Sequence, residues 1–154
     1  SSKQLTRVLA EKTGLDVLWS PKNSEFIYVE TENEGVRVLL RVTSLKDNTV
    51  ADLPFATLPE KCAWAPTDAS RVLYCAIPET IPRGTNIPDD WWQGTISFND
   101  ALWRIDLQKN ERTQILPLHQ LDAINLFLSE DESFLFFTNK KDGSLWSLHM
   151  EPGS

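Results

Sequence analysis

Long apolar segments, basic charge, cysteine and histidine are all scarce in this sequence. No apolar run approaches the roughly 18 residues of a membrane-spanning helix, so no membrane span is expected. Lys and Arg number 15 against 22 Asp and Glu, and the net charge of -7 disfavours nucleic acid as a partner because phosphate backbones are repelled. Two cysteines are too few for a disulfide framework.

Motifs of catalysis are also missing. The sequence has no Ser-His-Asp order, nucleophile elbow, phosphate-binding loop or carboxylate pair in a matched context. We therefore assign no catalytic residue, no metal site and no cofactor. Helical periodicity is absent as well, which favours an all-β domain.

The sequence does contain a repeated β-hairpin signal. Each copy has an apolar run, a short polar turn and a second run rich in aromatic and β-branched residues. The copies span 17–29, 62–75 and 125–137, with the turns PKNS, PTDAS and SEDE. A hydrophobic content of 41% in 154 residues is enough for one domain with a core.

A further pair of strands follows the first two hairpins. Residues 39–54 align without a gap with residues 102–117, whereas the third copy, 145–148, supplies only one strand. Trp19 and Trp64 occupy the same place in consecutive hairpins and lie 45 positions apart. A period in the forties with four short strands per unit is typical of β-propeller blades.

We predict one all-β propeller-type domain, residues 1–154, with blades of four antiparallel strands. Blade 1 spans 15–54, blade 2 spans 60–118 with an insertion at 79–99, and blade 3 spans 123–150 without its outer strand. Three blades cannot close a ring, because propellers have at least four.

The segment Leu5–Leu9 lies where the outer strand of a preceding blade would lie. We expect it to complete blade 3 of a second copy, so that a homodimer closes a six-bladed ring by strand exchange. The alternative is that the chain is half of a longer single-chain propeller, and the partner is then the other half.

The hairpins resemble the WD40-like repeats of TolB-type bacterial propellers. The resemblance rests on Trp-Ser-Pro at 19–21, Phe-Ile-Tyr-Val at 26–29 and the segment LSEDESFLFFTNKKDGSLWSL. The sequence departs from true WD40 repeats, because it lacks their Trp-Asp and Gly-His signatures. The resemblance implies a bacterial envelope protein and assigns no activity.

Residues 1–2 and 152–154 resemble additions, and we expect the natural protein to extend further at its N-terminus, where an export signal would lie.

The insertion at 79–99 is the main candidate for a binding site. We expect it to join the second and third strands of blade 2 on the face that carries the blade-to-blade connections. Its candidate ligand-binding residues are of types enriched at binding hot spots or able to contact a cation or a sugar: Arg83, Asp89, Asp90, Trp91 and Trp92. The alternative is that one or both tryptophans cap the blade. A cation site formed by Asp89, Asp90 and Asp100 lacks the ligand spacing of calcium loops.

Cys62 and Cys75 lie on the two strands of one hairpin. If Pro66 faces Arg71, the two cysteines face each other on one side of the sheet. A cross-strand disulfide and two free buried cysteines are both consistent with this spacing.

The leading functional interpretation is a non-enzymatic binding or scaffold module with a peptide or glycan ligand. The alternative is a glycan-acting enzyme that uses Asp16 and Asp122, which both precede inner strands and could meet near the ring axis. A purely structural role in assembly is the third possibility.

Overall fold

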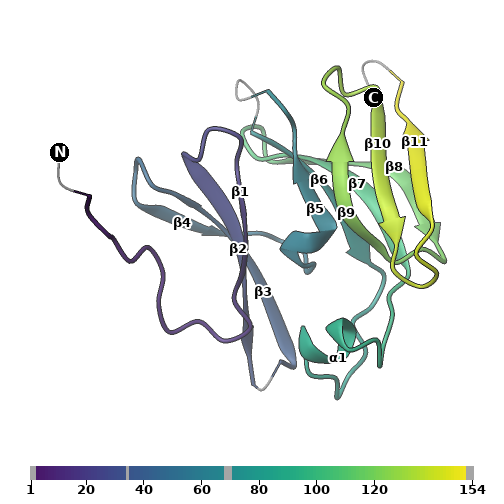
Figure 1. Ribbon diagram of the computed structural model, residues 1–154, viewed down its shortest axis with the longest axis horizontal. Helices are drawn as coiled ribbons and strands as arrows, with labels where there is room; N and C mark the ends of the chain where they lie inside the picture. Colours follow the sequence, from purple (N-terminus) through teal and green to yellow (C-terminus); the bar gives the residue numbers. More distant parts are fainter. Residues whose placement is uncertain (1–2, 34, 68–70, 152–154) are drawn as a thin grey trace.

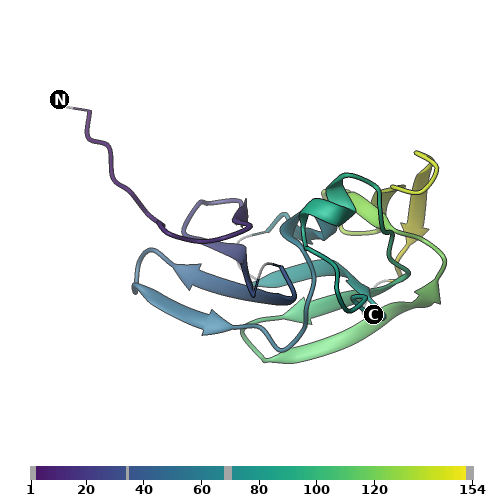
Figure 2. The same cartoon turned by 90° about the horizontal axis from the view of Figure 1, so that it is seen from below.

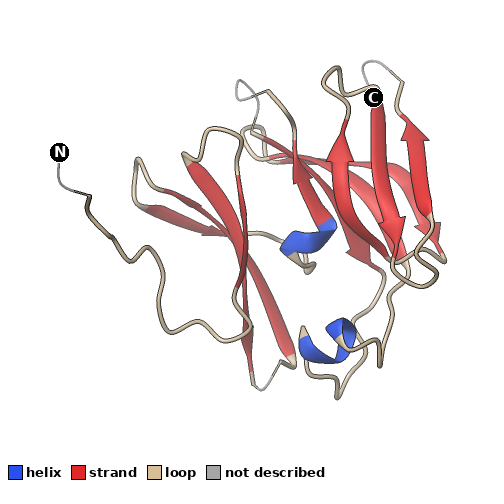
Figure 3. Ribbon diagram, in the orientation of Figure 1, coloured by secondary structure: helices blue, strands red, loops and turns tan. Residues whose placement is uncertain are grey.

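Antiparallel strands are the main regular structure of the molecule (Figures 1 and 3). The computed structural model describes residues 3–33, 35–67 and 71–151. The terminal residues 1–2 and 152–154, and part of the predicted turn PTDAS, lie outside the described residues.

The strands form three separate sheets, each a meander in chain order. The four strands of blade 1 are β1 (Asp16–Trp19), β2 (Glu25–Glu32), β3 (Arg37–Ser44) and β4 (Thr49–Asp52). Blade 2 contains β5 (Cys62–Trp64), β6 (Val72–Pro78), β7 (Asp100–Asp106) and β8 (Glu111–His119). Among the described residues, blade 3 has three strands: β9 (Ala123–Leu128), β10 (Phe134–Asn139) and β11 (Leu145–His149). The all-β prediction with four, four and three strands is confirmed.

Within the part of the chain that the structure describes, two short helices interrupt the strands. The 3-10 helix η1 (Pro59–Lys61) leads into β5, and α1 (Asp89–Trp92) lies in the insertion. Neither is long enough to cross a membrane, nor is any other helix of the described residues.

Apolar side chains from neighbouring blades form two cores. The core between blades 1 and 2 includes Ile27, Val29 and Leu40 from blade 1. The core between blades 2 and 3 includes Leu135 and Phe137 from blade 3. In β2 and β6 both sides of the strand are buried, because a blade is covered on both faces near its middle. This two-sided burial fits blades stacked side by side (Figure 1).

The structure corrects one repeat assignment, because the hairpin alignment of 17–29, 62–75 and 125–137 puts Phe127 in the position of Trp19 and Trp64. Trp19 pairs with Phe26, and Trp64 pairs with Leu73. In blade 3 the corresponding pair is Leu128 with Leu135 rather than one involving Phe127. Leu128 packs toward blade 2, and Phe127, its neighbour on the strand, therefore points away from blade 2. A bulge between Phe127 and Ile124 adds one residue to β9.

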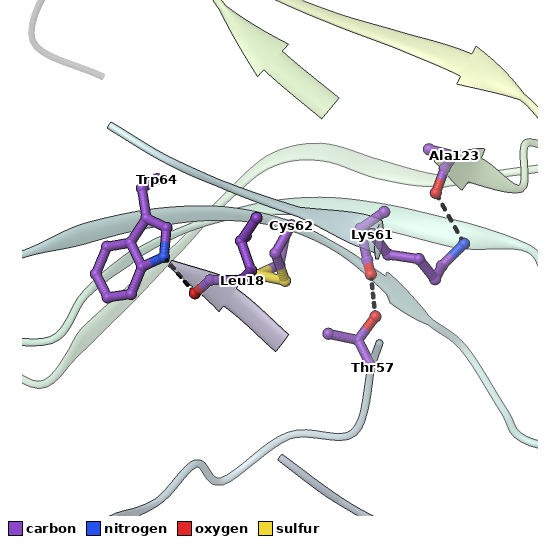
Figure 4. The surroundings of a disulfide bond; sticks show 8 residues. Leu18, Thr57, Lys61, Cys62, Trp64 and Ala123 are labelled. Carbon is purple, nitrogen blue, oxygen red and sulfur yellow. Dashed lines mark hydrogen bonds between the residues drawn. A yellow bond between two sulfur atoms is a disulfide. The ribbon is translucent and has the colours of Figure 1, made fainter. Parts of the chain in front are cut away.

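Cys62 faces Cys75 in the predicted register, and the structure joins them in a disulfide. Both residues are almost fully buried in the core between blades 1 and 2. Figure 4 shows the bridge between Trp64, whose Nε1 donates to the carbonyl of Leu18 at 3.1 Å, and Lys61. The alternative of two free cysteines is therefore wrong.

Residues 3–10 belong to no strand in the single chain. They leave blade 1 on the side opposite blade 2 and extend away from the body in both views (Figures 1 and 2). Leu5 is fully exposed and Val8 is half exposed. Pairing of Leu5–Leu9 with a second copy stays a prediction.

Candidate functional site

The insertion 79–99 lies over the face where the blades connect to one another. It leaves β6 and enters β7, as predicted. Ile87 N donates to the carbonyl of Gly35 at 3.3 Å, which attaches the insertion to the β2–β3 turn of blade 1. A Cβ on Gly35 would lie 2.5 Å from Ile87 N, so this contact requires glycine.

Trp91 is completely buried beneath the insertion. Its Nε1 donates to Asp122 Oδ2 at 2.9 Å, and its ring stacks on Phe98 with the centroids 5.9 Å apart. Lys140 Nζ donates to its backbone carbonyl at 2.6 Å and lies over the ring. Trp91 therefore caps the blade, which is the alternative to ligand binding, and its side chain has no contact with solvent.

A buried cluster of charged residues lies beside Trp91. Lys61 Nζ is 2.7 Å from Asp100 Oδ2 and 2.6 Å from Asp122 Oδ1, and it also donates to the carbonyl of Ala123 at 3.0 Å. The Lys61 and Asp122 side chains have no exposed surface. Because Lys61 precedes β5 and Asp122 precedes β9, the cluster ties the start of blade 2 to the start of blade 3.

The two carboxylates of this cluster differ in their hydrogen bonds. Asp122 also accepts from Phe98 N at 3.0 Å, whereas Asp100 Oδ1 has no partner. Burial raises the pKa of Asp100, and the charge of Lys61 opposes this shift. The pKa of Asp100 in the folded chain is raised above 3.8, so the protonated Asp100 carboxyl favours the folded state. This contribution to the free energy of unfolding is lost as the pH rises through the folded pKa.

Trp92 points to the outside of the same face. Its side chain is 46% exposed, and its Nε1 donates to Glu60 Oε1 at 2.7 Å. Burial raises the pKa of Glu60, and the negative charge of Asp16 raises it further. Burial also raises the pKa of Asp16 itself. The exposed indole and two carboxyl groups therefore lie near the starts of β1 and β5.

The predicted ligand residues separate into two groups. Arg83 and Asp89 are exposed together with Trp92. Asp90 accepts a hydrogen bond from Asn86 N at 2.7 Å and stabilises the loop before α1. With Trp91 in the core, two of the five candidates have structural roles.

The structure does not support the carboxylate pair of the enzyme alternative. Asp122 is enclosed by Lys61, Trp91 and Phe98, so its carboxylate is not accessible to a substrate. Within the described residues, no three His, Cys, Asp or Glu side chains are grouped so that they could hold a metal ion.

Two of the open spaces among the described residues are candidate binding surfaces. One, of about 360 Å³, lies next to the insertion and is lined by Gly94, Ile96, Ser97, Lys140 and Lys141, beside the buried Asp122. The second, of about 500 Å³, runs between β8 and β11 at the outer end of the blade 2–blade 3 junction. We call this second groove the outer groove. At the blade 1–blade 2 junction, a space lined by Phe55 and Arg112 among others is only about 20 Å³, and a separate space of about 360 Å³ lies beside the turns that contain Ser20, Asp47 and Arg71.

Known structures with a similar arrangement of strands are β-propellers. The β-propeller domain of the Trilobed protease from Pyrococcus furiosus, described as having an open velcro topology, matches 90% of this chain with a TM-score of 0.55 and 18% identity. Kuenenia stuttgartiensis hydrazine synthase matches 87% with a TM-score of 0.54 and 9% identity. The chain spans about 40% of the length of each. No protein-family model and no curated protein sequence matches. The fold of this chain is therefore that of a partial β-propeller.

Lys61, the centre of the buried cluster, was not among the residues predicted from the sequence. A signal was present, because Lys61 lies three positions before Trp64, as Asp16 lies three positions before Trp19. The sequence-based prediction noted a polar residue before an inner strand only for Asp16 and Asp122.

Proposed function

We propose that this chain is a half-propeller that closes into a ring with a second copy and serves as a non-enzymatic binding scaffold. The observation that carries the proposal is the outer groove, which stays open where the fourth strand of blade 3 would lie. At the blade 1–blade 2 junction, where blade 2 has its fourth strand, the space beside Arg112 on β8 is only about 20 Å³. The unpaired edge of β11 offers backbone groups to an incoming strand.

The outward face of blade 3 favours the same assembly. Phe127 and Phe136 stack with their centroids 4.8 Å apart, and Phe134 continues the row. Phe127 is 52% exposed. On blade 1, Trp19 and Val17 are also exposed, and Trp19 lines the same open space along the inner strands as Phe127. A two-fold ring packs the blade 3 face of each copy on the blade 1 face of the other.

The strand exchange follows from chain order. In this chain the outer strand of one blade leads directly into the inner strand of the next, from β4 to β5 and from β8 to β9. Residues 5–9 precede β1 in the same way. A strand that completes blade 3 of one copy is therefore continuous with blade 1 of the copy packed beside it.

The test is the mass of the protein in solution, measured by light scattering over a range of concentrations. We expect a dimer, and we expect a Leu5→Asp/Val8→Asp variant to be a folded monomer. Val36→Asp, at an exposed apolar residue in the β2–β3 turn, is the matched control and leaves the dimer intact. A monomeric wild-type chain at every concentration would exclude the ring and favour a longer single-chain propeller.

A second part of the proposal concerns the ligand. The exposed indole of Trp92 is suited to a peptide or a glycan, because a flat aromatic ring stacks on either. The groove lined by Gly94, Ile96 and Ser97 of the same insertion offers further contact surface. A binding screen of both ligand classes tests this, with Trp92→Ala expected to abolish the signal and Trp92→Phe to retain part of it. A ligand that binds both variants as tightly as wild type would show that Trp92 is not part of the site.

We also propose that the blades are of the TolB-type, WD40-like kind and that the protein functions outside the cytoplasm. The buried disulfide supports this location, because structural disulfides form and persist in oxidising compartments. Recovery of the oxidised chain from a periplasmic fraction, tested by mass before and after reduction, checks the location.

A further inference from the structure

Acidic side chains predominate along the outer groove. Asp131, Glu132 and Glu151 line it, against a single permanent cation, Arg104. Glu132 Oε1 accepts a hydrogen bond from Tyr74 at 3.1 Å, which holds this carboxylate at the groove wall. The groove therefore attracts a basic segment.

The N-terminal arm, defined here as residues 3–9, is such a segment. It carries Lys3 and Arg7 and no acidic residue, in a chain whose net charge is -7. The arm also contains Leu5 and Val8, which have no apolar cover in the single chain. Charge and hydrophobicity of the arm thus complement the groove.

Blade 2 shows what an outer strand contributes at the corresponding place. The Arg112 guanidinium on β8 lies 5.6 Å from the ring centre of Trp103 and 5.8 Å from that of Phe55. The counterparts of these two rings in the next repeat are Trp146 and Leu118, and both are largely exposed. The residue that corresponds to Arg112 would lie on the fourth strand of blade 3.

Repeat spacing indicates which arm side chains face this place. In the observed register Arg41 holds in blade 1 the place that Trp103 holds in blade 2, because each lies opposite the residue two positions after the partner of Trp19 or Trp64. Gln114, opposite Trp103, lies 14 residues before Leu128, and Asp52, opposite Arg41, lies 12 residues before Trp64. Counted back from Trp19, these spacings put Leu5 or Arg7 opposite Trp146. Side chains alternate along a strand, so with either spacing Lys3, Leu5 and Arg7 face the same side.

We propose that the outer groove recognises the arm of a second copy by charge, with Lys3 and Arg7 directed toward the acidic wall and Trp146. This inference rests on the proposed ring and specifies what selects the partner strand. The acidic groove rejects an acidic strand, and a basic side chain over Trp146 reproduces the contact of Arg112 with Trp103.

The experiment is a charge exchange read by sedimentation. A Lys3→Glu/Arg7→Glu chain and a Glu132→Lys/Glu151→Lys chain are each expected to self-associate roughly tenfold or more weakly than wild type. An equimolar mixture is expected to regain dimerisation, because in the mixed dimer both junctions pair opposite charges. Lys46→Glu/Lys109→Glu makes the same change in net charge on exposed turns and is expected to leave association unchanged.

Trp146 gives a second measurement. Its fluorescence, isolated as the difference between wild type and Trp146→Phe, is expected to shift to shorter wavelength on dimerisation, and the shift is expected to be absent in the Lys3→Glu/Arg7→Glu chain. If wild type dimerises and Leu5→Asp/Val8→Asp does not, but charge reversal changes nothing, recognition by charge is wrong and the ring stands. If wild type is monomeric throughout, both are wrong.

Discussion

Lys61 is a charged side chain without any exposed surface. An isolated buried ammonium group is very unfavourable, and here two carboxylates and a carbonyl oxygen compensate it. Removing Lys61 alone would leave both carboxylates buried without their cation. The stability of the junction between blades 2 and 3 therefore depends on this one residue.

We predict that Lys61→Met lowers the free energy of unfolding by about 3–5 kcal/mol, the usual cost of breaking a buried ion pair on one side. Lys140→Met is the matched control. Lys140 is only half-buried and donates one hydrogen bond, to Trp91, so its loss is expected to cost about 1 kcal/mol. Urea denaturation followed by circular dichroism measures both. Equal losses in the two variants would show that the cluster contributes no more than a surface contact.

Residue-level roles were the hardest to predict from the sequence. Trp91 and Trp92 are adjacent and identical in type, yet α1 places one in the core and the other at the surface. Four residues are too few for helical periodicity to be visible, so the sequence could not separate them. It could predict only that the insertion contains a candidate site, and Trp92, Arg83 and Asp89 are the members that remain exposed.

At the level of elements, the sequence was far more informative. Each predicted hairpin is present, because apolar runs bounded by turn residues are a local signal. The register of β9 was the exception. Asn125 adopts a left-handed conformation with φ of 53°, and the bulge in this strand shifts which residues face blade 2. Sequence spacing does not reveal such an extra residue.

The disulfide of the β5–β6 hairpin is the element whose contribution can be measured directly. It closes a short loop, with a sequence separation of 13, within the core of blades 1 and 2. We expect Cys62→Ala/Cys75→Ala to lower the free energy of unfolding by about 2–4 kcal/mol, since a bridge restricts the unfolded chain. The oxidised wild type is compared with the wild type in a strong reductant, which should lose a similar amount. A double variant as stable as wild type would mean that the bridge adds nothing to the packing of the two blades.

At the scale of the whole molecule, the two ends of the half ring are complementary. Blade 1 ends the row with exposed Trp19 and Val17 and with the N-terminal arm, and blade 3 ends it with the phenylalanine row and the outer groove. The N-terminal arm at blade 1 is therefore complementary to the outer groove at blade 3, and each end presents an apolar face to the other. A chain of three blades that stayed single would leave both apolar faces in water.

The stability of a ring held together in this way must depend on protein concentration. Because only the folded chain dimerises, mass action raises the melting temperature as concentration increases. Phe127→Ser removes a ring from the blade 3 face without touching either core, since Phe127 points away from blade 2. We predict that this variant melts at the temperature of the dilute wild type and loses the concentration dependence. Val36→Ser, at an equally exposed apolar residue in a turn, is expected to behave as wild type. A wild-type melting temperature that is constant over a hundredfold range of concentration would mean that the faces of blades 1 and 3 do not pack on a second copy.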